Sequence, residues 1–208
     1  MVHRMRGLLL LALVFSMVML AGGAKAQEAP AYTLRVLHTN DHHSHLEPVA
    51  VGDKMLGGVA RRATLINQIR AQGGNTLLVD GGDVFQGTLF FNQYQGQADL
   101  YFYNALGYEG MAVGNHEFDK GQQVLADFAK GAKFPLLSAN TVIDPASPLY
   151  GLIQGYTVKE IGGQKVGIIG LTTEDTTILS SPGPGIAFAP HQEAVRLVIA
   201  ELQGAGIN

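Results

Sequence analysis

Three short polar clusters carry the side chains that could do chemistry in this sequence. They are Asp41 with His43, then Asp83, then Asn115 with His116. Carboxylate, imidazole and amide groups are ligands that hard or borderline divalent metals prefer. The sequence has no cysteine, so any metal site must be built from such oxygen and nitrogen ligands. The clusters therefore predict a metal centre.

Each cluster on its own is also typical of an ordinary turn. Asp41 can end a strand, His43 can lie in a solvated loop, and Asp83 after two glycines can be a plain turn residue. Asn115 suits a left-handed turn, and His116 suits the start of a helix. The recurrence of the pattern after three predicted strands favours a site, because sites in open α/β sheets gather at the carboxyl ends of strands.

Predicted strands and helices alternate along most of the chain. The strands are expected at 33–39, 76–79, 110–113 and 135–138, the helices at 61–72, 98–106, 122–130 and 192–202, and a hairpin joins 156–161 to 165–171. This order predicts an α/β fold with a mainly parallel sheet, helices that cover it and some antiparallel pairing. The first strand carries Leu34, Val36 and Leu37, and we expect it to be buried.

Length, composition and charge narrow the class of protein. The chain has 208 residues, of which 47% are apolar and 27 are glycine, which suits one sizeable globular domain with many tight turns. The formal net charge is -3, so no basic excess indicates a nucleic-acid polymer as a partner.

Residues 1–26 have the pattern of an export signal. Basic residues precede an apolar run at 8–20, and Ala24-Lys25-Ala26 offers a small-residue cleavage site. The run is shorter than the roughly 20 residues that a membrane-spanning helix needs. We therefore predict cleavage before Gln27, a periplasmic or secreted bacterial protein, and no membrane attachment after cleavage.

The residue types suit two cations better than one. Two divalent cations about 3.5–4 Å apart can bridge a phosphate, but they repel each other, so they need a shared anionic ligand. Asp83 suits that bridging position, and Gly81 and Gly82 leave room beside it. Asn115 offers a neutral oxygen, which limits the negative charge next to a phosphate.

Several blocks of the sequence resemble the signature blocks of the 5'-nucleotidase family, which belongs to the calcineurin-like metallophosphoesterases. The main blocks are LHTNDHH at 37–43, GDVFQGT at 82–88 and GNHEFD at 114–119, with further similar blocks at 57–62, 137–140 and 170–173. The resemblance runs from about Leu34 to the end of the chain. It implies a layered α/β/β/α metallophosphoesterase sandwich.

The resemblance also implies a role for each matching residue. Asp41 and His43 would bind a first metal, Asp83 would bridge, and Asn115 would bind a second metal. The cofactors would be two divalent ions such as zinc or manganese.

Two further residues receive catalytic roles from the resemblance. His116 would lie by the phosphate as a charge stabiliser or proton donor, and Asp119 would orient it and raise its pKa. Asp119 also suits an alternative or additional role as the N-cap of the following helix. Four neighbours are expected to be structural, exposed or in outer contact with the site: His38, His42, His45 and Asp80.

The family's remaining histidine blocks, a Gly-His and a Gly-His-x-His, do not occur here. His191 precedes a predicted helix and is not assigned to the site. We therefore expect residues 27–208 to be an incomplete metallophosphoesterase domain, truncated at its C-terminus, without the family's C-terminal nucleotide-recognition domain.

The implied activity is metal-dependent hydrolysis of 5'-nucleotides to nucleosides and phosphate, with a small nucleotide as substrate. One alternative keeps the fold and changes the substrate to a 2',3'-cyclic nucleotide or a sulfur-oxidation intermediate. Another is an inactive fragment or a metal-binding remnant.

Overall fold

The computed structural model describes residues 32–207, and the predicted export signal at 1–26 lies outside the described residues. The chain separates into two units, Met1–Thr33 and Leu34–Asn208, and the description below concerns the second. Among the described residues, no helix combines the length and the apolar character needed to cross a membrane.

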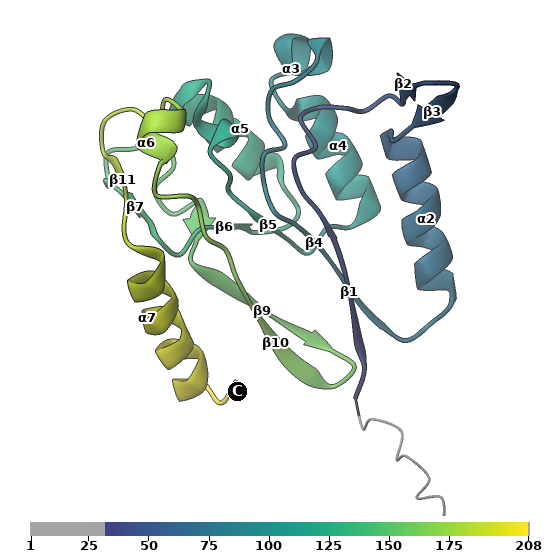
Figure 1. Cartoon of the computed structure of the whole chain (residues 1–208). Coiled ribbons are helices and arrows are strands. Elements are labelled where there is room, and N and C mark those ends of the chain that lie inside the picture. The colour runs from purple at the N-terminus through teal and green to yellow at the C-terminus, as the bar shows by residue number, and fades with distance from the viewer. Residues whose placement is uncertain (1–31, 208) are drawn as a thin grey trace, which may run out of the picture. The chain divides into compact units, whose positions relative to one another are not determined.

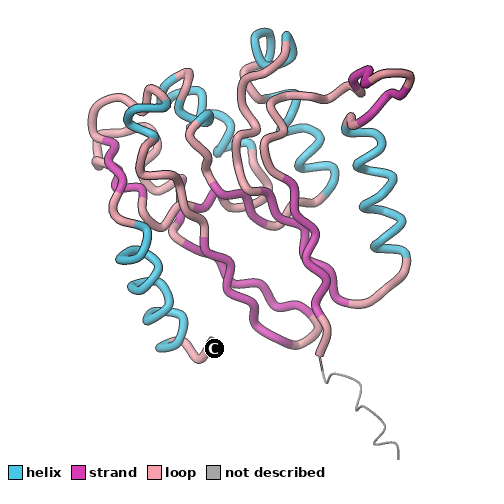
Figure 2. The backbone as a smooth tube through the Cα atoms, viewed as in Figure 1, coloured by secondary structure: helices cyan, strands magenta, loops and turns pink. Residues whose placement is uncertain are grey.

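Five strands form the central sheet of this unit (Figures 1 and 2). Their order is β1-β4-β5-β6-β8, and all four neighbouring pairs are parallel. The bounds are β1 Leu34–Thr39, β4 Asn75–Asp80, β5 Gly110–Ala112, β6 Leu136–Leu137 and β8 Ile153–Gln154. The predicted mainly parallel sheet is confirmed.

Helices cover one face of this sheet and share its apolar core. They are α2 (Val59–Ala71), α4 (Gln97–Leu106) and α5 (Gly121–Gly131). Each contributes buried side chains to the same core cluster as the strands, including Ile66, Tyr103 and Phe128 beside Leu78 and Met111. The short helix α3 (Leu89–Tyr94) precedes α4.

An antiparallel hairpin lies against the other face of the sheet (Figure 1). It pairs β9 (Tyr156–Ile161) with β10 (Gln164–Ile169). A Cβ placed on Gly110 of the sheet would lie 3.9 Å from Ile168 of the hairpin. Helix α7 (His191–Gly204) packs on the hairpin in turn. The approach is close, since a Cβ placed on Gly167 of β10 would lie 2.9 Å from Leu202 of α7. The layers follow the order helix, sheet, hairpin, helix.

Smaller strands and helices complete the fold. They are the hairpin of β2 (Val49–Val51) and β3 (Lys54–Leu56), the antiparallel pair β7 (Thr141–Ile143) and β11 (Ile186–Phe188), the 3-10 helix η1 (His116–Phe118) and the helix α6 (Thr176–Leu179).

The prediction that the first strand is buried was wrong. Strand β1 stands first in the sheet order and pairs with β4. Val36 in its middle is 52% exposed, although Leu37 packs against the core. A strand that is buried on both faces and an edge strand that is buried on one face can carry similar apolar runs, so the sequence favoured the wrong environment.

Candidate metal centre

The three polar clusters of the sequence follow β1, β4 and β5, which are neighbours in the sheet. Parallel neighbours end at the same edge, so the loops that follow them meet there. The backbone N–H of Asp41 donates to the carbonyl of Gly82 at 2.9 Å, and that of His43 donates to the carbonyl of Asp83 at 3.1 Å. The first two loops are therefore joined along their length.

Three side chains from the three loops come together at this edge. The ligand atoms of His43, Asp83 and His116 all lie within 4.8 Å of one another. Asp41 adjoins this group, because its Oδ1 lies 3.8 Å from Nε2 of His43. The imidazole of His43 and the carboxylates of Asp41 and Asp83 are donors that fit a divalent cation, and the imidazole of His116 lies within reach of them.

The hydrogen bond of His43 prepares its ring for a metal. Its Nδ1 lies 2.9 Å from the carbonyl oxygen of Phe85, and a carbonyl can only accept, so Nδ1 carries the proton. The lone pair is then on Nε2, the atom nearer to Asp41. A histidine that donates one ring N–H to a carbonyl while the other nitrogen is free is the usual state of a metal ligand.

The second and third loops are joined at Asp83. Its Oδ1 accepts a hydrogen bond from the backbone N–H of His116 at 3.0 Å. A Cβ on Gly114 would lie 2.2 Å from that same oxygen, so only glycine permits this approach. In the chain, Asn115 lies between Gly114 and His116, and its side chain makes no capping hydrogen bond to η1. Its predicted role as a ligand stays a prediction.

The backbone is strained at three of the four predicted ligands. Asp41, His43 and Asp83 have φ angles of 51°, 46° and 56°, in the left-handed region that non-glycine residues seldom adopt. Each such residue costs about 1–2 kcal/mol. Strain of this kind persists where surrounding contacts enforce it, and it clusters at functional sites.

His116 and Asp119 form a hydrogen-bonded pair at the rim of the cluster. Nδ1 of His116 lies 2.7 Å from Oδ2 of Asp119, whose Oδ1 accepts from Ser180 at 2.5 Å. Burial alone would lower the pKa of His116, but the hydrogen bond and charge of Asp119, together with Asp83, raise it above its ordinary value. Burial opposes ionisation of Asp119, yet the hydrogen bonds from His116 and Ser180 lower its pKa overall.

The alternative role of Asp119 as a helix cap is not seen. Helix α5 has Lys120 at its N-cap position, with no side-chain capping bond. The pairing with His116 is therefore the interaction that the structure records.

The four titratable residues that neighbour the predicted ligands differ in burial and in contacts. Asp80 is buried and accepts from the hydroxyl of Tyr103 at 2.9 Å and the backbone N–H of Gly82 at 2.8 Å. Burial raises its pKa. His42 is buried beside Arg62, whose Nη2 lies 3.0 Å and 3.1 Å from its two ring nitrogens, whereas His38 and His45 are exposed.

Two buried carboxylates near the site were not singled out from the sequence. Asp99 on α4 accepts from Ser44 at 2.7 Å, and its other oxygen lies 3.2 Å from Nε2 of His42. Glu117 is fully buried between the second and third loops, and burial, reinforced by the charge of Asp83, raises its pKa to about 7. The sequence shows only that each is an acidic residue within a predicted segment. It does not show where either side chain points.

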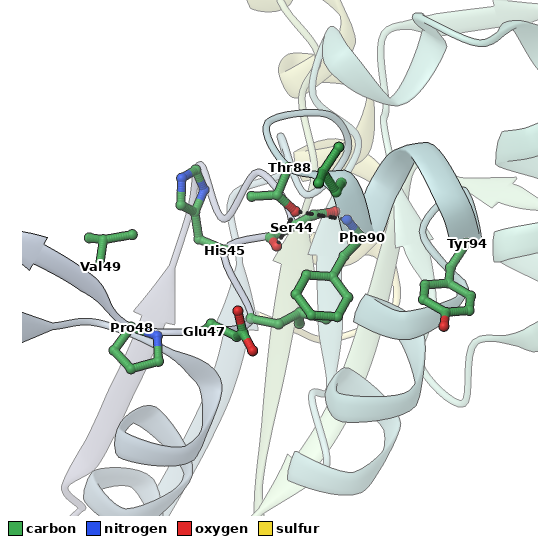
Figure 3. Close-up of a pocket in the computed structure, with 10 residues that line it drawn as sticks. Ser44, His45, Glu47, Pro48, Val49, Thr88, Phe90 and Tyr94 are labelled. Atoms are coloured by element: carbon green, nitrogen blue, oxygen red, sulfur yellow. Dashed lines mark hydrogen bonds between the residues drawn. The ribbon is translucent and has the colours of Figure 1, made fainter.

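A cavity of about 530 Å³ lies beside the first loop rather than over the cluster. Figure 3 shows Val49 and His45 on one side of it and Phe90 and Tyr94 on the other. Thr88 in its wall donates to the carbonyl of Ser44 at 2.8 Å. Most of the lining residues are apolar, so the cavity presents mainly apolar surface next to the candidate metal centre.

The sequence pattern that defines the calcineurin-like phosphoesterases matches residues 34–192, which contain every member of the cluster. This chain belongs to the calcineurin-like phosphoesterase family. Calcineurin-like phosphoesterases use divalent metals, and the donor set at the sheet edge fits that chemistry.

Several calcineurin-like phosphoesterases with high similarity are named nucleotidases. The chain is 45% identical over 189 residues to a snake venom 5'-nucleotidase from Naja atra, covering 86% of this chain and 35% of the relative. The crystal structure of a 5'-nucleotidase precursor from Thermus thermophilus is 50% identical with a TM-score of 0.83, covering 85% of this chain and 36% of that one.

A third similar structure is the NAD nucleotidase of Haemophilus influenzae. It is 35% identical with a TM-score of 0.78, and the match covers 84% of this chain and 33% of that chain. The chain thus spans about a third of the length of the relatives it matches.

Proposed function

We propose that this chain is the N-terminal, metal-binding part of an exported hydrolase that releases phosphate from 5'-nucleotides. The observation that carries the proposal is the meeting of His43, Asp83 and His116 at the carboxyl ends of three adjacent parallel strands. The names of the similar proteins support a nucleotide as the substrate.

Four residues are proposed to hold the metals. Asp41 and His43 would hold one cation and Asn115 the other, with Asp83 shared between them. Two bound divalent cations supply an activated water and positive charge opposite the phosphate. The hydrogen bond from His43 to Phe85 fixes the ring orientation that this assignment needs.

His116 is proposed to act on the phosphate and not as a ligand. Its Nδ1 is paired with Asp119, so Nε2 is the nitrogen left to contact a substrate. The carboxylate partner favours the protonated imidazole, which cannot ligate a metal but can donate to a phosphate oxygen or to a leaving group. Asp119 would hold that ring in place, and Ser180 would hold Asp119.

The span and the location of the protein are further parts of the proposal. Because the chain matches about a third of each relative, we propose a longer parent protein that supplies the remaining ligands and the nucleotide-recognition domain. The predicted signal at 1–26 supports export, and a matched relative is a venom protein.

Hydrolysis assays on the parent protein test this function. Product release would be measured as phosphate from a nucleoside monophosphate, as the ring-opened monophosphate from a 2',3'-cyclic nucleotide and as sulfate from a thiosulfonate, before and after chelation and after Mn²⁺ is restored. We expect metal-dependent release that is fastest from the monophosphate. Release that survives complete chelation, or a clear preference for the thiosulfonate, would refute the proposal.

A further inference from the structure

The fully buried side chain of Glu117 has no role in the chemistry proposed above. Its carboxylate accepts four backbone hydrogen bonds. Oε1 accepts from Val84 at 2.7 Å and Phe85 at 3.2 Å, and Oε2 accepts from Asp83 at 2.9 Å and Gly114 at 2.7 Å. The donors belong to two loops, one after β4 and the other after β5.

These contacts occupy both oxygens of the carboxylate. A carboxylate oxygen has about two acceptor positions, and each oxygen of Glu117 already has two N–H donors. Glu117 is therefore not arranged as a metal ligand, although it lies two residues from Asn115. Its contacts connect the loop of Asp83 to the loop of His116.

The backbone and the side chain of Asp83 are each held by a hydrogen bond to the 116–117 segment. Its N–H donates to Glu117, and its Oδ1 accepts from the backbone N–H of His116. The φ angle of 56° at Asp83 requires such restraint, because a free aspartate would leave the left-handed region. Glu117 thus acts on the orientation of Asp83 and not only on the stability of the fold.

We propose that Glu117 is a positioning residue, which sets the relative placement of Asp83, Asn115 and His116 for metal binding. The inference rests on the proposed function in so far as Asp83 is taken as a ligand. It predicts that loss of the Glu117 carboxylate weakens metal binding by a protein that is still folded.

Glu117→Gln is the direct variant. Glutamine has the same shape, but its amide nitrogen would point N–H groups at two of the four backbone donors. Loss of a group that orients a metal ligand typically costs about 10–100-fold in affinity. Glu109→Gln is the matched control, because Oε2 of Glu109 accepts from the backbone N–H of Leu78 at 3.1 Å on β4, before the site begins.

Mn²⁺ titration of the metal-free parent protein, without substrate, gives the affinity, and thermal unfolding gives the stability. We expect Glu117→Gln to bind Mn²⁺ about 10–100-fold more weakly, and Glu109→Gln to bind it as the unsubstituted protein does. Equal affinities in folded Glu117→Gln and in the unsubstituted protein would overturn the inference and leave the nucleotidase proposal intact.

A second variant covers the case in which Glu117→Gln does not fold. Glu117→Asp keeps the charge but shortens the reach by one methylene, so it cannot satisfy both loops at once. We expect it to fold and to bind Mn²⁺ more weakly than the unsubstituted protein. Undiminished Mn²⁺ affinity in this variant would also contradict the inference, and a lack of Mn²⁺ binding by the unsubstituted protein would overturn the proposed metal centre with it.

Discussion

Nδ1 of His116 lies 2.7 Å from Oδ2 of Asp119, so one nitrogen of the imidazole is already paired with a carboxylate. The other ring nitrogen, Nε2, remains for contacts within the group that His116 forms with His43 and Asp83. In the proposed function, the charge of Asp119 favours a proton on His116 and assigns this ring to the phosphate, whereas the neutral carbonyl of Phe85 leaves Nε2 of His43 free for a metal.

Asp119→Asn should reduce turnover of a nucleoside monophosphate and leave the metal content unchanged. The amide cannot hold the protonated imidazole as a carboxylate does, and general acid–base groups contribute about 10²–10⁴-fold to rate. Steady-state hydrolysis and metal analysis of the parent protein would measure both effects. Asp127→Asn, an exposed change on α5, is the control, and equal turnover in the two variants would contradict the role of Asp119.

Gly114→Ala should weaken metal binding and destabilise the fold. The added Cβ would lie 2.2 Å from Oδ1 of Asp83, so the second and third loops must separate. Overpacking of this kind costs about 1–3 kcal/mol. Gly204→Ala at the end of α7 is the control, since a Cβ there meets nothing within 4 Å. Chemical denaturation and Mn²⁺ titration would be compared, and a Gly114→Ala protein that matches the control in both would refute the close packing.

Asp99→Ala should lower the free energy of unfolding by about 1–3 kcal/mol, the usual cost of leaving a buried hydrogen-bonding group such as the Ser44 hydroxyl without its partner. The change leaves Ser44 and His42 without the carboxylate that they contact beneath the first loop. Urea denaturation would measure the loss against Asp127→Ala, for which a surface change within about 0.5 kcal/mol is expected. A loss below about 1 kcal/mol would show that the buried contacts of Asp99 contribute little.

The exported protein should begin at Gln27. The apolar run and the Ala24-Lys25-Ala26 site place the cut there. Mass spectrometry of the protein recovered outside the cytoplasm would give the N-terminus. An intact Met1 on that material would exclude cleavage.

The sequence carried enough information to predict the frame and the location of the clusters. Strands β1, β4 and β5 each carry apolar residues and are followed by polar ones, and parallel neighbours end at one edge, so Asp41, Asp83 and Asn115 lie in loops at the same sheet edge. The long helices and the hairpin of β9 and β10 also have clear periodicity.

Other features depend on tertiary contacts that no local pattern encodes. Strand β11 has three residues inside the Pro/Gly-rich segment 180–190, which has no strand pattern of its own, and it pairs with β7. Leu65 suits the apolar face of α2 in sequence but is 57% exposed, whereas its neighbour Ile66 is buried in the core. The direction of the Glu117 side chain depends on the turn that η1 makes. The three residues of η1 do not specify that turn by themselves.

Metal content and turnover of Asp83→Ala and His116→Ala, measured together in the parent protein, test the central claim most directly. Asp83→Ala removes the proposed shared ligand, so both the metal and the activity should be lost. His116→Ala should keep nearly all of the metal while turnover falls by about 10²–10⁴-fold. If His116→Ala lost its metal as completely as Asp83→Ala, His116 would be a ligand and the division of roles would be wrong.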